Sequence, residues 1–413
     1  MNINYINKKP FVEGVCLNNI TNSHSTPFYL YSQKKISETF ENLKFNLCSE
    51  IFYAVKANSN QAILTLFKNM GAGADVVSVG ELNRALKAKF KPDKIIFEGV
   101  GKSKEDIEFA IKKNIRLINT ESKNEIKLIN AISKNLNKKT NIGIRLNPNI
   151  NSKSINKIST GKKTDKFGIP INELNEIILL TKNLKNINLI GISCHIGSQI
   201  MDIATFAKVF KTMKEAASLA LSKKIPLKFL DLGGGFGISY KTNNDLNIKN
   251  IKKLLNTFFG DVPYSISFEP GRFLIAKSGV IITKILNSKK NGGVNYLITD
   301  AGMHTFMRPA LYNANHRIEA LQDMKKKKIK YTIAGPICES SDIISKNTFL
   351  PTQKEGNYLI IHDAGAYGSV MASNYNSRGL PSEILVSQNM YSIIYKREKI
   401  SDIIKKDLIP KWI

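Results

Sequence analysis

Cysteine is scarce in this chain of 413 residues, and its spacing excludes two kinds of site. The four cysteines, Cys16, Cys48, Cys194 and Cys338, stand far apart and form no Cys-x-x-Cys pair. That spacing indicates neither a zinc site nor a disulfide framework, so no metal is expected. Thiols without partners suit a reducing compartment, and we expect a cytoplasmic protein.

Long apolar runs are missing as well. A membrane-spanning helix needs about 18 consecutive apolar residues, and the sequence contains no such run. Residues 1–15 mix Asn, Lys and Pro instead of joining a basic stub to an apolar stretch, so a signal peptide is not expected. The hydrophobic fraction of 42% is still ample for packed cores, and the length indicates two domains.

Acidic residues are few, since 33 Asp and Glu stand against 61 Lys and Arg and leave a net charge of +28. An excess of this size could attract nucleic acid or an anionic membrane surface. The lysines are scattered over the whole length, however, and their densest run has no interleaved aromatic residues. We therefore expect neither partner, whereas small acidic substrates would be attracted.

Short apolar runs rich in β-branched residues alternate with longer segments of helical spacing from about residue 50 to about residue 270. An amphipathic stretch follows each of the first seven runs. The eight runs are Ile51–Val55, Ala74–Val77, Lys94–Phe97, Arg116–Ile118, Ile142–Leu146, Leu189–Cys194, Phe229–Leu232 and Ser265–Phe268. This rhythm predicts an α/β fold, a (β/α)8 TIM barrel, with a doubly wound open sheet as the alternative.

The sequence pattern changes near residue 279, where short strand-like segments and turns replace long helical segments. The pieces are Val280–Ile285, Asn295–Thr299, Lys330–Ala334 and Asn357–Asp363. A further extended piece, Pro27–Ser32, lies near the start of the chain and could join them. We therefore expect a barrel over residues 33–278 and a second, mainly β domain made of residues 1–32 and 279–413.

Residues that can carry chemistry fall where the expected strands end, which is where TIM barrels place catalytic groups. Lys56 stands alone at the end of the first apolar strand. Desolvation there should lower the pKa of Lys56 and favour the neutral amine that attacks an aldehyde. A lysine that merely extends from a strand end into solvent is the alternative.

A glycine run, Gly233–Gly237, follows the seventh strand, and Gly271-Arg272 follows the eighth. Backbone amides of such loops commonly hold a phosphate in barrels. A tight turn is the simpler reading of the glycine run alone. A dinucleotide fingerprint fits poorly, because the strict G-x-G-x-x-G spacing is absent.

Two further strand ends carry side chains suited to a heterocyclic ring. Glu269 could bind a ring nitrogen and keep that nitrogen protonated, and His195 could lie flat against the ring. A structural role is as good an explanation for either residue alone. The combination of an amine, anion donors and a carboxylate indicates a cofactor with an aldehyde, a phosphate and a ring nitrogen.

These motifs identify a resemblance that covers nearly the whole chain. The barrel part contributes Tyr53–Asn58, Gly73–Glu81, Lys166–Gly168, His195–Gln199, Gly233–Gly237 and Glu269–Arg272, and the second part contributes Asp300–Met303, Met307–Tyr312, Gly335–Asp342 and Asp363–Gly368. The chain resembles diaminopimelate decarboxylases, fold-type III members of the alanine-racemase-like group of enzymes that use pyridoxal 5'-phosphate. The resemblance implies decarboxylation of meso-2,6-diaminopimelate to L-lysine and carbon dioxide, the last step of lysine biosynthesis.

The family implies a role for each matching residue. The catalytic set is Lys56, His195, Glu269 and Cys338, in which Lys56 binds the cofactor aldehyde and Cys338 returns a proton to the substrate carbon. The remaining cofactor contacts are Ser198, Gly233, Gly234, Gly235, Gly271, Arg272 and Tyr367. The substrate contacts are Arg272, Arg308, Tyr312, Glu339 and Tyr367. A planar guanidinium suits a carboxylate.

The resemblance also bears on the oligomeric state and the substrate, and the sequence departs from the family pattern at two places. In the family, the pair that matches Cys338 and Glu339 reaches the partner subunit's barrel, which implies a homodimer with shared active sites. A related decarboxylase for ornithine, arginine or carboxynorspermidine is the alternative, and it should not need the full carboxylate clamp. The departures are Ile155, where relatives often have histidine, and His304-Thr305, which replace an Asn-Asp pair.

Overall fold

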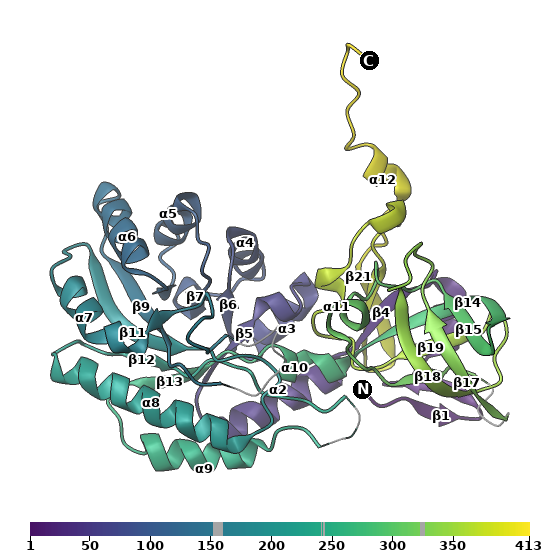
Figure 1. The fold of residues 1–413 in the computed structure, drawn as a ribbon, viewed down its shortest axis with the longest axis horizontal. Coiled ribbons are helices and arrows are strands. Elements are labelled where there is room, and N and C mark those ends of the chain that lie inside the picture. Colours follow the sequence, from purple (N-terminus) through teal and green to yellow (C-terminus); the bar gives the residue numbers. More distant parts are fainter. Residues whose placement is uncertain (152–159, 241, 243, 323–326) are drawn as a thin grey trace. The chain divides into compact units, whose positions relative to one another are not determined.

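The computed structural model describes residues 1–151, 160–240, 242, 244–322 and 327–413 (Figure 1). These residues form two compact units. The first comprises Thr39–Ser239 and Asn244–Phe273, and the second comprises Met1–Glu38, Tyr240–Asn243 and Leu274–Ile413. Ile155 lies outside the described residues.

The first unit contains eight parallel strands that pair in a closed ring. They are β5 (Glu50–Ala54), β6 (Gly73–Val76), β7 (Ile95–Phe97), β8 (Leu117–Thr120), β9 (Thr140–Asn147), β11 (Ile187–Cys194), β12 (Phe229–Asp231) and β13 (Ser265–Phe268). The ring closes where β13 pairs β5, with Ser267 opposite Glu50 and Phe268 opposite Ile51. The predicted barrel is confirmed, and an open sheet is excluded because these strands leave no free edge.

A helix follows each barrel strand, as the alternating sequence pattern requires. The helices are α3 (Gln61–Asn69), α4 (Val79–Lys87), α5 (Lys104–Lys112), α6 (Lys123–Asn135), α7 (Leu174–Lys182), α8 (Ile203–Ser222), α9 (Ile248–Phe259) and α10 (Arg272–Ile275), and α2 (Gln33–Leu47) precedes β5. Ser78, Ser103 and Ser122 accept a hydrogen bond from the backbone three residues later and so begin α4, α5 and α6. Each serine therefore converts a strand end into a helix start.

An aromatic cluster packs α8 and α9 against the barrel. Phe210 is completely buried, and its ring centroid lies 6.3 Å from that of Phe206, 5.7 Å from that of Phe259 and 6.3 Å from that of Phe268. The four rings come from two helices and β13. Their burial removes a large apolar area from water, which makes this cluster a main source of stability for the first unit.

The second unit is mainly β. Its large sheet consists of β4 (Phe28–Ser32), β14 (Gly279–Asn291), β15 (Val294–Thr299), β16 (Ile318–Ala320), β17 (Lys328–Ala334), β18 (Ile343–Pro351), β19 (Tyr358–Ile361), β20 (Ser382–Ser387) and β21 (Met390–Tyr395). A small sheet consists of β1 (Asn4–Ile6), β2 (Lys9–Val12) and β3 (Val15–Cys16), and the helices are α1 (Leu17–Ser23), α11 (Arg308–Tyr312) and α12 (Ile400–Ile404). The early strand β4 pairs β14 and β20, so the two ends of the sequence share one sheet.

The second unit buries its own apolar cluster, which includes Phe28, Leu30, Val280, Ile282 and Ile384. These residues come from β4, β14 and β20. Of the helices in the described part of the chain, none combines the length and the apolar character needed to cross a membrane.

We expect Phe210→Ala to lower the free energy of unfolding of the barrel unit by about 3–5 kcal/mol, because the truncated side chain leaves a cavity among the three remaining rings. Urea denaturation followed by circular dichroism measures the change. Phe45→Ala is the matched control, since Phe45 is 77% exposed and its loss should cost little. Equal effects of the two substitutions would contradict the assignment of the aromatic cluster.

Candidate active site

Charged and polar side chains gather at one end of the barrel. Each lies within two residues of the carboxyl end of a strand, and together they comprise Lys56, Asp75, Glu98, Arg145, His195, Asp231 and Glu269. Because parallel strands end on the same side of a barrel, these seven side chains surround one mouth. This barrel mouth is the candidate active site.

Lys56 lies in the single turn Val55–Ala57 that follows β5, and it has a carboxylate neighbour. Its Nζ lies 2.5 Å from Oδ2 of Asp75 on β6, and the Asp75 side chain is fully buried, whereas that of Lys56 is 36% exposed. The expectation that Lys56 stands alone is therefore wrong. A buried carboxylate that binds the amine fixes where Nζ lies and supplies a partner of opposite charge.

Glu269 directly follows β13, the strand that pairs β5, and its side chain is buried. Oε1 of Glu269 has no hydrogen-bond partner. Burial raises the pKa of Glu269 well above its usual range, and Asp231 and Asp75 raise it further, whereas Lys56 opposes the shift. A buried carboxyl oxygen without a partner is costly unless a ligand supplies a donor.

Arg145 on β9 lies between two more carboxylates. Its Nη1 lies 3.5 Å from Oε2 of Glu98 and 3.3 Å from Oε1 of Glu121, and all three side chains are buried. Asn119 donates to the other oxygen of Glu98. Burial raises the pKa of Glu98, and Arg145 opposes that shift. Arg145 therefore offsets part of the negative charge of the barrel mouth.

His195 follows β11 and receives a hydrogen bond from the glycine run. The N–H of Gly234 donates to Nδ1 of His195 over 3.2 Å, so Nδ1 carries no proton. Burial lowers the pKa of His195 well below its usual range, and the positive charges of Arg145 and Lys56 lower it further. The ring is therefore neutral at physiological pH and fixed in one tautomer.

The glycine run after β12 is held by Asp231. Its Oδ1 accepts from the N–H of Gly233 over 2.7 Å, and its Oδ2 accepts from Ser267 over 2.5 Å. Burial raises the pKa of Asp231 to about 7. A Cβ atom at Gly234 would lie 2.2 Å from the carbonyl oxygen of Glu269, so only glycine fits there.

Positive φ angles of +69° and +81° at Gly233 and Gly235 strengthen the requirement for glycine. Next to this run, Nε of Arg272 donates to Oγ of Ser198 over 3.2 Å, and Arg272 is buried. The structure therefore brings Ser198 and Arg272 together, as the sequence-based assignment of both to the cofactor requires. A guanidinium, a hydroxyl and glycine backbone suit a phosphate.

The barrel mouth fits pyridoxal phosphate on two observations from this unit. The orphaned Oε1 of Glu269 can accept the N–H of a pyridinium ring, whose positive charge would also relieve the crowding of carboxylates. The glycines after β12 form a cradle that a Cβ atom would fill. The amine of Lys56, which the sequence predicts to bind the aldehyde, lies at the same mouth.

In the second unit, Arg308 begins α11 and Tyr312 ends it. Arg308 is buried, its Nε donates to Nε2 of His316 over 3.3 Å, and its guanidinium carbon lies 5.1 Å from the ring centroid of Tyr240. Tyr312 is half-buried one turn further along the same helix. These two sequence-predicted clamp residues therefore belong to one short helix.

Cys338 and Glu339 lie exposed in the turn between β17 and β18. Tyr375 and Ser341 both donate to the carboxylate of Glu339, and these hydrogen bonds hold its pKa below the usual range. Asp342 fixes the turn, since it accepts from Ile337 N–H over 2.8 Å and from Met303 N–H over 2.6 Å. The turn presents Cys338 and Glu339 in a defined position.

Tyr367 lies in the loop after β19 and has a φ of +53°, a conformation that non-glycine residues rarely adopt.

His304 and Thr305, which depart from the family pattern, are buried in the same unit. Burial lowers the pKa of His304 to about 4, so its imidazole is neutral at physiological pH.

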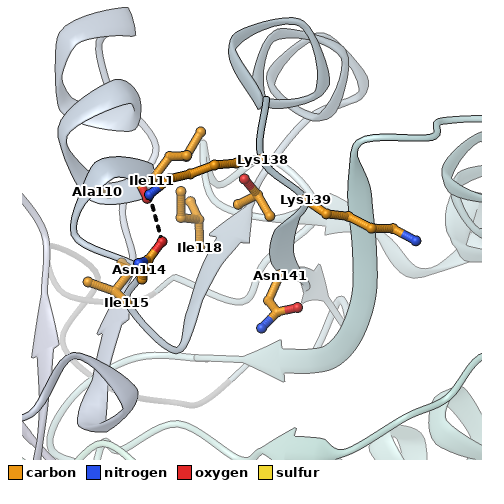
Figure 2. A pocket seen from close by; sticks show the side chains of 9 residues that line it. Ala110, Ile111, Asn114, Ile115, Ile118, Lys138, Lys139 and Asn141 are labelled. Atoms are coloured by element: carbon orange, nitrogen blue, oxygen red, sulfur yellow. Dashed lines mark hydrogen bonds between the residues drawn. The ribbon is translucent and has the colours of Figure 1, made fainter. Parts of the chain in front are cut away.

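A separate pocket lies between the carboxyl ends of α5 and α6, at the starts of β8 and β9 (Figure 2). Figure 2 shows Lys138 pointing to Asn114, and its Nζ donates to Oδ1 of Asn114 over 2.7 Å and to the carbonyl oxygen of Ile111 over 3.1 Å. Lys138 thus caps the end of α5. The pocket lies at the amino-terminal face of the barrel, where stability rather than catalysis is expected.

Sequence reasoning missed four charged residues at the barrel mouth, namely Asp75, Glu98, Arg145 and Asp231. The available signal was a charged residue within or directly after an apolar strand, where a solvated role is improbable. Asp342 was also missed, because its role is a pair of hydrogen bonds to residues that are five and thirty-nine positions away.

Comparison with known proteins gives consistent matches. The model of the family described as "Pyridoxal-dependent decarboxylase, pyridoxal binding domain" matches residues 33–276. A diaminopimelate decarboxylase of Helicobacter pylori is 41% identical over 386 residues, which cover 92% of this chain and 95% of that relative. One of Aquifex aeolicus is 36% identical over 408 residues, which cover 98% and 97%.

A solved structure agrees with the sequence matches. The crystal structure of diaminopimelate decarboxylase from Helicobacter pylori complexed with L-lysine has a TM-score of 0.91 with this chain at 39% identity, and the match covers 94% of this chain and 98% of that one. The likeness therefore extends over both units.

We expect Gly234→Ala to weaken binding of pyridoxal phosphate by roughly tenfold or more, because the new Cβ must displace the backbone at Glu269. Titration of the apoprotein with pyridoxal phosphate, followed by absorbance, measures the dissociation constant. Gly101→Ala is the matched control, since a Cβ there meets nothing within 4 Å. Unchanged affinity in Gly234→Ala would show that the glycine run does not shape the cofactor site.

Proposed function

This chain belongs to the pyridoxal-dependent diaminopimelate decarboxylases, and we propose that its barrel mouth removes one carboxylate of meso-2,6-diaminopimelate to leave L-lysine. One observation carries the proposal for the site. The strands β5 and β13 pair with each other. After β5, the amine of Lys56 is bound to the buried carboxylate of Asp75, and directly after β13, the buried Oε1 of Glu269 has no hydrogen-bond partner.

Bound pyridoxal phosphate supplies an electron sink for the pair of electrons that remains when carbon dioxide leaves. Lys56 would hold the cofactor through the aldehyde, because its amine is the nucleophile at this end of the barrel. Asp75 holds Nζ of Lys56 in position, because its buried carboxylate is a partner of that amine. Glu269 would accept the ring N–H at Oε1, the buried oxygen that has no partner, and so favour the positively charged ring nitrogen.

Other residues of the barrel hold the cofactor in place. His195 stays neutral and can lie against the ring without adding a positive charge. Gly233, Gly234, Gly235 and Gly271 would let the backbone approach the phosphate, and Ser198 and Arg272 would supply donors to it. The neutral His195 matters because a second cation beside the ring would repel the positive charge of a protonated ring nitrogen.

The substrate needs recognition at the carboxylate that is not lost. Arg308 and Tyr312, with Arg272, form that clamp, Glu339 faces the distal amine, and Tyr367 contributes from its loop. The lowered pKa of Glu339 supports this role, because the carboxylate is ionised and can pair with an ammonium group. Binding energy from this remote end orients the reacting end.

Cys338 delivers the proton to the carbon that has lost its carboxylate. Both Cys338 and Glu339 are exposed on a turn that Asp342 fixes, which supports their insertion into the barrel of a second copy. We therefore propose a homodimer with shared active sites. A cytoplasmic location completes the proposal, supported by four free cysteines.

A related decarboxylase for ornithine, arginine or carboxynorspermidine is the second candidate. The full clamp of Arg308, Tyr312 and Glu339 favours diaminopimelate, because those substrates lack a distal carboxylate. Release of carbon dioxide and L-lysine from meso-diaminopimelate, with none from ornithine or arginine, tests the choice.

We expect Lys56→Ala to abolish decarboxylation, since the described barrel mouth places no other lysine amine beside Asp75. Borohydride reduction of the loaded wild-type protein, followed by peptide mapping, should find the pyridoxyl group on Lys56. Lys94→Ala is a suitable control, because Lys94 pairs Glu50 at the opposite end of β5. A main adduct on any lysine other than Lys56 would overturn the assignment.

We expect Cys338→Ala to keep cofactor binding and lower turnover by roughly a hundredfold or more, the usual cost of losing a general acid. Mixing Lys56→Ala subunits with Cys338→Ala subunits should give more activity than either variant alone, because a hybrid dimer has one site with both groups. Cys48→Ala, which removes another exposed thiol, is the control. No recovery after mass spectrometry has shown subunit exchange would count against shared sites.

A further inference from the structure

The second unit holds the guanidinium of Arg308 by contacts that the clamp itself does not explain. Nε of Arg308 donates to Nε2 of His316 over 3.3 Å, and the face of Tyr240 lies 5.1 Å from the guanidinium carbon. Arg308 and His316 are both buried. One hydrogen bond and one aromatic face thus restrain the same guanidinium.

The hydrogen bonds of His316 define its tautomer. Nδ1 of His316 lies 2.9 Å from the carbonyl oxygen of His362, and a carbonyl can only accept, so Nδ1 carries the proton. Nε2 must then be the acceptor, which is the role that the donor Nε of Arg308 requires. A proton on Nε2 would set two donors against each other.

The imidazole is also confined on its sides. Its ring centroid lies 4.8 Å from that of Tyr240 at an interplanar angle of 65°, and 4.6 Å from that of Phe306 at 74°. The next histidine is fixed too, because His362 lies 3.0 Å from a carboxylate oxygen of Glu319 and 3.1 Å from Nη2 of Arg317. The acceptor that faces Arg308 therefore has little freedom to move.

We propose that His316, backed by the ring of Tyr240, is a positioning residue that orients Arg308 for the carboxylate the reaction leaves on its product. This inference rests on the clamp role of Arg308 in the proposed function. A guanidinium can bind a carboxylate side-on through Nε or end-on through its two terminal nitrogens. Because His316 takes Nε, it selects the end-on arrangement and thereby the direction from which the substrate carboxylate arrives.

Two substitutions separate positioning from support of the fold. In His316→Gln, the side-chain oxygen can reach the place of Nε2 and accept from Arg308, but the donor to His362 is lost. In His316→Asn, the amide can replace Nδ1 as that donor, but the shorter side chain does not reach Nε of Arg308. His24→Asn is the control, since His24 contacts the ring of Tyr391 in the same unit.

We expect His316→Asn to raise KM for meso-diaminopimelate about tenfold while kcat stays within about threefold, the pattern of lost ground-state binding. His316→Gln should stay within about threefold of wild type in both constants. A His316→Asn enzyme with an unchanged KM, or Asn and Gln variants with equal losses, would overturn the proposal.

Circular dichroism melting shows whether each variant folds. If neither His316 variant does, Tyr240→Leu decides the matter: it removes the aromatic face, so KM should rise several-fold, and an unchanged KM overturns the proposal. Calorimetry measures the dissociation constant of L-lysine for the enzyme loaded with cofactor, and it needs no turnover. The dissociation constant should rise in His316→Asn and stay close to the wild-type value in His316→Gln. A wild-type protein that binds L-lysine but releases no carbon dioxide contradicts the proposed function, while the dissociation constants still decide the role of His316.

Discussion

Crowded carboxylates at the mouth of the barrel are the constraint on which the site depends. Each is at most 6% exposed; the four are Asp75, Glu98, Asp231 and Glu269. Burying several negative charges together is expensive unless cations or protons balance them. Lys56 and Arg145 supply part of that balance, and the raised pKa values of Glu98, Asp231 and Glu269 reduce the negative charge further. A cofactor with a positively charged ring nitrogen would complete it.

The same constraint explains how the loops are built. Asp231 uses both carboxylate oxygens within the protein, one on the N–H of Gly233 and one on Ser267, so it acts as a structural anchor. Glu269 keeps one oxygen without a partner and so remains able to bind a ligand. Two carboxylates on adjacent strands therefore serve different purposes, and the number of their internal hydrogen bonds distinguishes them.

The β unit holds a guanidinium and a thiol in defined positions. Arg308 is oriented by His316 and Tyr240, and the turn with Cys338 is pinned by Asp342. In both cases the hydrogen bonds of a neighbouring side chain fix the position of the group. Such supporting contacts determine how accurately a site binds, although they touch neither substrate nor cofactor.

The sequence by itself determined a parallel β/α fold, because apolar runs alternate with helical stretches. The motifs at strand ends indicated Lys56, His195, Glu269 and the glycine run as site candidates. The choice of a closed barrel over an open sheet needed the pairing of β13 with β5. The sequence could not give Asp75 as the partner of Lys56, Arg145 between Glu98 and Glu121, or His316 behind Arg308. Those pairs join different strands, loops or helices, and the spacing of residues along a chain does not encode which side chains meet across a ring of strands. Tertiary structure decided them, since only packing brings buried charges close enough for each to set the other's position and pKa.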